Sequence, residues 1–242
     1  MLFASCLVGT ALHADGDSAL YLLAGLDGKI LTNQDANNYF NLPAGQLGPQ
    51  GIPSGVVHAG FQFKQWLALE ASANFGPNRS NSVDYHNGIF GTTRQVTTRW
   101  GLTTYSVTPA LTWAGMGFVN FLGLRLGLAN LSGHVDDNAY GFNGSYDQSA
   151  QTYDVGLLFR SSQIYVSHVS LGLELGYDYT MFNDIKNTNG TGTYATPHSP
   201  ERNVSNVAHN GDQTSLDFSG GHVALVIGLW TNSPVTADAP AK

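Results

Sequence analysis

Alternation of apolar side chains with polar or small ones runs through most of the chain and constrains its fold more than any other feature. It is regular over residues 67–74, where one set is Leu67, Leu69, Ala71 and Ala73 and the other is Ala68, Glu70, Ser72 and Asn74. A period of two residues places each set on its own face of a β-strand, whereas a helix would mix them. The pattern therefore predicts an all-β protein whose strands have one broad apolar face.

The pattern recurs in eight segments, and the connections between them have two very different sizes. The predicted strands cover residues 18–31, 55–64, 67–75, 100–113, 118–131, 153–160 and 169–179, and a last strand ends at Trp230. Long polar connections are predicted over residues 32–54, 76–98, 132–149 and 183–213, and short turns separate the other strands. Pro109 predicts a local bulge, and Gly220 and Gly221 leave the register of the last strand open.

The number and placement of the charged residues indicate whether the apolar face meets lipid or the interior of a soluble barrel. Only 11% of the residues are charged, against roughly 25% in soluble domains. The polar strand faces carry nearly balanced charges, which are Asp27, Lys29, Lys64, Glu70, Arg125, Asp154, Arg160, Glu174 and Asp178. We predict that these nine side chains form a polar network inside a narrow lumen while the apolar face meets lipid. The predicted fold is an eight-stranded antiparallel transmembrane up-and-down β-barrel with long extracellular loops and short periplasmic turns. A soluble lipocalin-like barrel is the alternative.

The two ends of the chain differ from the predicted barrel. Residues 1–14 are predicted to be a signal peptide that lacks its basic start, residues 18–230 the outer-membrane barrel, and residues 231–242 a flexible periplasmic tail. The only cysteine of the sequence, Cys6, lies in the first of these segments, so the predicted barrel can form no disulfide. The net charge of −7 argues against a nucleic-acid partner.

Two stretches resemble a known family of membrane barrels. They are "GVVHAGFQFKQWLALEASANFG" at residues 55–76 and "SLGLELGYDYT" at residues 170–180. The first is similar to a hairpin, and the second to the penultimate strand, of the outer-membrane β-barrels that include the OmpA transmembrane domain and the neisserial opacity proteins. The resemblance implies a bacterial outer-membrane location and a barrel, and its loose motifs specify no activity.

From this pattern we predict a barrel that serves envelope structure and surface recognition or adhesion through its four polar loops. The expected partners are outer-membrane lipid and host or surface ligands at the loops. We expect no enzymatic activity, no cofactor, no metal and a monomeric state. A small gated channel for ions or solutes is one alternative, because charges are predicted to line the lumen.

A lipid A acyl hydrolase is the other alternative. His168, Ser170 and Glu174 share one strand face, and they are the residue types that a serine hydrolase uses as base, nucleophile and orienting acid. The "His-x-Ser" spacing is similar to that of lipid A deacylases of the PagL type. Leu171 stands where that family has an asparagine, and evenly spaced polar residues are also expected on any lumen-facing strand.

Overall fold

A computed structural model of the chain describes residues 18–31, 51–77, 79–86, 93–115, 117–139, 142–165, 168–183, 185–191 and 216–231. The predicted signal peptide lies outside these residues, as does the predicted tail beyond Thr231. The strands are β1 (Ala19–Leu31), β2 (Gly51–Lys64), β3 (Leu67–Phe75), β4 (Arg79–His86), β5 (Thr93–Gly115), β6 (Phe118–Ala139), β7 (Phe142–Tyr165), β8 (Val169–Phe182), β9 (Lys186–Thr191), β10 (Leu216–Asp217) and β11 (Gly220–Trp230). No helix in the described segments is long and apolar enough to cross a membrane.

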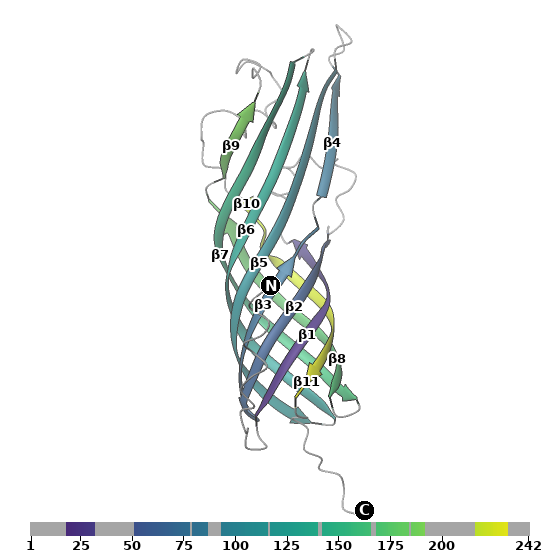
Figure 1. The fold of residues 1–242 in the computed structure, drawn as a ribbon, viewed down its shortest axis with the longest axis vertical. Helices are drawn as coiled ribbons and strands as arrows, with labels where there is room; N and C mark the ends of the chain where they lie inside the picture. The colour runs from purple at the N-terminus through teal and green to yellow at the C-terminus, as the bar shows by residue number, and fades with distance from the viewer. Residues whose placement is uncertain are drawn as a thin grey trace, which may run out of the picture.

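Eight of these strands close into an antiparallel barrel, as the alternation predicted (Figure 1). The order around the barrel is β1, β2, β3, β5, β6, β7, β8 and β11, and β11 returns to pair with β1. The closing pair joins Tyr21 to Trp230 and Leu31 to Gly220. Closure leaves no free sheet edge within this ring, which is required of strands that cross a bilayer.

Three barrel strands are far longer than a membrane crossing needs. β5 has 23 residues, β6 has 22 and β7 has 24, whereas about 9–11 residues span a bilayer. In Figure 1 these strands rise well beyond the barrel, with β4 and β9 beside them. β4 pairs with β5, and β9 pairs with β7. We call this part of the molecule the extension: β4, β9, and residues 93–102 of β5, 129–139 of β6 and 142–152 of β7.

The extension corrects three of the loop predictions. Parts of residues 76–98, 132–149 and 183–213 form β-strands, where the sequence predicted polar loops, and β2 likewise begins at Gly51, inside the predicted connection 32–54. These segments lack an apolar alternation because neither of their faces meets lipid. The backbone ladder, the Thr- and Ser-rich composition and polar contacts between the strands support them instead. β7 also continues through residues 161–163, which were predicted to reverse the chain, and ends at Tyr165.

The bulge predicted at Pro109 was wrong. β5 and β6 keep the same register on both sides of it, since Val107 pairs with Leu126 and Ala110 with Gly123. The register shifts instead in β2, between Gln62 and Lys64. Proline therefore interrupts the pairing to β6 locally without adding a residue to the strand.

A continuous apolar belt covers the outside of the barrel. Its exposed side chains include Leu22, Leu26, Val57, Leu69, Val107, Leu111, Leu122, Leu124, Leu126, Leu128, Leu157, Leu171, Leu173, Leu175, Val223, Leu225, Ile227 and Leu229. The last four fix the register of β11, which the sequence left open, with His222, Ala224 and Val226 pointing inward. Soluble monomers rarely expose a continuous apolar surface of this extent.

Aromatic side chains border this belt at both ends. At the end that continues into the long loops they are Phe75, Tyr105, Tyr153, Tyr177 and Tyr179, and at the end with the short turns they include Phe63, Trp66, Trp113, Phe118 and Tyr165. Amphipathic aromatic rings are enriched where a membrane meets water. The short turns lie at the second end; the turn from β5 to β6 contains Gly117 at φ 82°, a conformation that favours glycine.

Candidate functional site

The lumen contains eight of the nine charged residues that the sequence assigned to it. The buried ones are Asp27, Lys29, Glu70, Arg125, Asp154, Arg160, Glu174 and Asp178. Lys64 is the exception, and its side chain is exposed. The register shift between Gln62 and Lys64 changes the inward and outward alternation at the end of β2, so the sequence parity that placed Lys64 inside does not hold there.

Arg160 of β7 joins two carboxylates across the turn-side half of the lumen. Its Nη2 donates to Glu70 of β3, and its Nη1 donates to Glu174 Oε2 of β8 at 3.2 Å. The guanidinium also lies 4.4 Å from the ring centroid of Phe121, within the range of a cation–π contact. Because these residues are 0–4% exposed, their charges are removed from water and depend on one another.

Arg125 of β6 organises the other half of the network. Its Nη1 donates to both oxygens of Asp178, at 3.0 and 3.1 Å. Its Nη2 lies 3.4 Å from Glu174 Oε1, so Glu174 links the two arginines. Lys29 of β1 approaches Asp178 Oδ2 at 3.8 Å, and its Nζ donates to the Thr180 hydroxyl at 3.2 Å.

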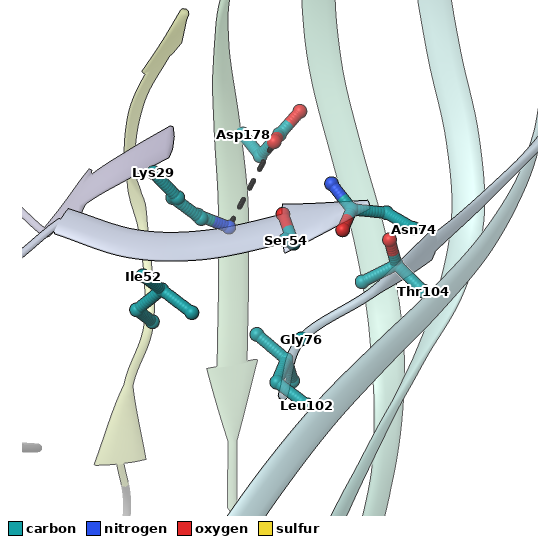
Figure 2. A pocket seen from close by; sticks show the side chains of 8 residues that line it. All are labelled: Lys29, Ile52, Ser54, Asn74, Gly76, Leu102, Thr104 and Asp178. Atoms are coloured by element: carbon teal, nitrogen blue, oxygen red, sulfur yellow. Dashed lines mark ion pairs between the residues drawn. The ribbon is translucent and has the colours of Figure 1, made fainter. Parts of the chain in front are cut away.

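The loop-side end of the network contains a small cavity next to Lys29 and Asp178 (Figure 2). The cavity measures about 20 Å³ and is also lined by Ser54, Asn74 and Thr104, and a polar space of this size holds about one water molecule. Asn74 and Ser54 donate to Asp27 Oδ2 at 2.6 and 3.2 Å. These contacts satisfy one oxygen of Asp27, and its Oδ1 is buried without a partner in the described part of the chain.

Sequence reasoning missed two members of the network, His58 and His222. Both are buried, at 0% and 3% exposure, and both contact carboxylates. Alternation along β2 already places His58 on the same face as Gln62, so its position could have been found. His222 could not, because its orientation depends on the register of β11.

Apolar layers enclose the charges at both ends of the lumen. On the turn side, Tyr21 and Trp230 pack with their ring centroids 4.6 Å apart, and the Trp230 indole donates to Ser170 at 2.9 Å. On the loop side, Phe218 contacts Trp100 and Phe182 at centroid distances of 5.7 and 5.6 Å. Side chains thus fill the interior, as expected for a barrel of eight strands.

The three residues considered for a hydrolase do not contact one another as a catalytic triad would. The His168 Nδ1 lies 3.0 Å from the Trp230 carbonyl oxygen, and the Ser170 hydroxyl accepts the Trp230 indole N–H. Glu174 instead belongs to the arginine network. His168 is exposed at the turn, whereas Ser170 and Glu174 are buried, so the base and the nucleophile would work in different environments.

The extension has a second, surface cluster of charges that crosses three strands. Arg99 of β5 lies 3.7 Å from Asp136 of β6, and the two ring nitrogens of His134 face Asp136 at 3.1 Å and Asp147 of β7 at 2.7 Å. The hydrogen bond to Asp147, supported by Asp136, raises the pKa of His134. In the described part of the chain, no group of three or more His, Cys, Asp and Glu residues is arranged to hold a metal ion.

This cluster predicts a pH dependence of the extension. A raised pKa means that the His134 contribution to stability is fully present below the unfolded value, about 6.5, and is lost as the pH rises through the folded value. We expect Asp147→Asn to lower the titration midpoint of His134, measured from its ring resonances by NMR. An unchanged midpoint in this variant would show that the carboxylate does not hold the proton there.

The closed barrel, its apolar belt and the aromatic borders together are the features of a bacterial outer-membrane barrel. The chain spans the outer membrane. No protein-family model and no curated protein matches it. Among solved structures, it is similar to the attachment invasion locus protein Ail of Yersinia pestis, with 8% identity, 88% of this chain and 99% of that chain covered, and a TM-score of 0.43.

Two further solved structures are similar over the same share of the chain. A major outer membrane protein of Thermus thermophilus has 13% identity, 88% of this chain and 98% of that chain covered, and a TM-score of 0.49. Neisserial surface protein A has 12% identity, 88% and 96% covered, and a TM-score of 0.39.

Proposed function

We propose that the barrel anchors the extension at the cell surface, where its polar outward face takes part in recognition or adhesion, and that the chain has no enzymatic activity. The proposal depends on one observation: three barrel strands continue as a paired sheet beyond the apolar belt. Membrane anchoring needs strands of about 9–11 residues, and the strands β5, β6 and β7 have 22–24. The extra length therefore serves the water-exposed side.

The outward face of the extension has the chemistry of a binding surface for polar partners. Hydroxyl and amide side chains alternate along it, including Ser82 paired with Thr97 at 3.1 Å and Gln151 donating to Asn130 at 3.0 Å. The charges of Arg99, Asp136 and Asp147 are paired within the sheet through His134. The described side chains of this surface therefore carry little uncompensated charge, which favours hydrogen bonding to glycans or protein surfaces over capture of a polyanion.

A shortened hairpin tests the proposal. Ser132 and Ser149 are paired across β6 and β7, so residues 133–148 can be replaced by Asn-Gly, a two-residue hairpin turn. We expect cells carrying the full chain to adhere to immobilised extracellular-matrix proteins or glycans, and the shortened variant to adhere no better than cells without the protein. Lys64→Gln, a change at the opposite end of the barrel, is the control and should adhere normally. Equal adhesion of the shortened and full chains would contradict the proposal.

The filled lumen predicts that the chain does not conduct. In planar bilayers we expect no stepwise single-channel current, because Arg160 and Arg125 bridge the lumen and apolar layers lie at both of its ends. Steady single-channel currents that change in Glu70→Ala would support the channel alternative instead.

A further inference from the structure

The lumen holds more carboxylates than permanent cations. The buried acids are Asp27, Glu70, Asp154, Glu174 and Asp178, and the buried permanent cations are Lys29, Arg125 and Arg160. Five acids against three bases leave two negative charges without a counterpart. An uncompensated charge in such surroundings costs several kcal/mol, so the lumen is balanced either by two further positive charges or by protons on two of the carboxyl groups.

His58 lies between two of these acids. Its Nδ1 is 2.8 Å from Glu70 Oε1, and its Nε2 is 3.5 Å from Glu174 Oε2. The second distance is long for a hydrogen bond and suits an ion pair. Both nitrogens of the ring therefore face carboxylate oxygens, and the ring is 0% exposed.

His222, on β11, repeats this arrangement on the other side of Glu174. Its Nδ1 is 3.1 Å from Asp178 Oδ2, and its Nε2 is 3.6 Å from Glu174 Oε1. Gly176 makes the space for this ring, because a Cβ at that position would overlap the His222 Cε1 atom. One carboxylate, that of Glu174, thus separates the two imidazole rings.

A neutral imidazole satisfies this geometry only in part, because the Nδ1 of each ring hydrogen-bonds a carboxylate while the Nε2 of each ring is buried without a hydrogen-bond partner in the described part of the chain. It carries one N–H and one lone pair, whereas an ionised carboxylate only accepts hydrogen bonds. In either neutral tautomer one ring nitrogen would direct its lone pair at a carboxylate oxygen. An imidazolium donates from both nitrogens and adds one positive charge.

We propose that His58 and His222 are both imidazolium ions in the folded barrel and that the lumen is a buried site for two protons. Five acids then face five cations. The groups around the rings come from every side: Lys29 from β1, Glu70 from β3, Arg125 from β6, Asp154 and Arg160 from β7, and Glu174 and Asp178 from β8. The arginines oppose protonation of the rings, but each is itself bonded to a carboxylate. Without these two protons the lumen would carry a charge of −2.

Nitrogen NMR of the refolded full chain, labelled with ¹⁵N-histidine in detergent micelles, tests the proposal. His58→Gln and His222→Gln identify the two sets of signals. At neutral pH we expect both sets to have the shifts of imidazolium. A neutral-ring shift for either one would overturn the proposal and place the missing proton on a carboxyl group such as that of Asp154.

A double-mutant cycle gives a second readout that does not depend on the spectra. Folded barrels and heat-unfolded chains run as separate bands in detergent gels. We expect His58→Gln to lower the temperature at which the band of folded protein disappears, because Glu70 then lacks one positive partner. Adding Glu70→Gln should recover part of that loss, since Arg160 keeps Glu174 at 3.2 Å. If the losses of the two single variants simply add, His58 carries no charge that Glu70 senses, and the proposal fails. Neither result bears on adhesion by the extension.

Discussion

Replacing Arg160 by methionine is expected to lower the free energy of unfolding of the barrel by about 3–5 kcal/mol, the usual cost of removing one partner from a buried ion pair. Methionine keeps an unbranched side chain of similar reach against Phe121, which the guanidinium contacts at 4.4 Å. The loss therefore reports on Glu70 and Glu174, both buried and both bonded to Arg160. The free energy of unfolding can be measured by urea titration in lipid vesicles, with the folded and unfolded fractions determined from their separate bands in detergent gels.

Arg99→Met is the matched control for this experiment. The Arg99 side chain is 59% exposed and lies 3.7 Å from Asp136 on the extension, so water already solvates both charges. Exposed pairs contribute about 0–1 kcal/mol, and we expect a loss in that range. If the two variants lost the same stability, the lumen charges would be as well hydrated as the surface ones, and the barrel could not be sealed.

The sequence predicted the barrel because lipid imposes its alternation on every crossing strand. Leu122, Leu124 and Leu126 point outward and Arg125 points inward, and that contrast can be seen in the residues alone. Glu70 and Glu174, which the same parity assigns to the polar face, are buried. The alternation gave the wrong side for Lys64, which follows a register shift in β2. No residue type near this shift predicts it.

The extension could not be predicted from alternation because water meets both the strand side chains and the loops there. Residues such as Ser132 and Gln151 are compatible with either strand or loop, and the pairing of β6 with β7 decides between them. The ion pairs of the lumen were also beyond the sequence. Parity assigns a side chain to the inside, but the stagger of the strands determines that Arg160 meets Glu70, 90 residues away. The direction of a side chain can thus be predicted from its neighbours along the chain, whereas its contact partners depend on how distant strands are aligned.

Leu173→Arg is expected to lower the free energy of unfolding by about 2–4 kcal/mol, the cost of a lipid-facing arginine near the bilayer midplane. Leu173 lies on β8 between the turn end at Val169 and the aromatic border at Tyr177, with Leu171 and Leu175 exposed on the same face. Ser132→Arg is the control, because Ser132 is exposed on the extension beyond the belt, where a surface change costs no more than about 0.5 kcal/mol. Unfolding in vesicles should separate the two variants, and the difference should shrink in vesicles of thinner bilayers, whose midplane is closer to water. Equal effects would mean that the belt does not face hydrocarbon, because the arginine at 173 would then cost no more than an arginine placed in water.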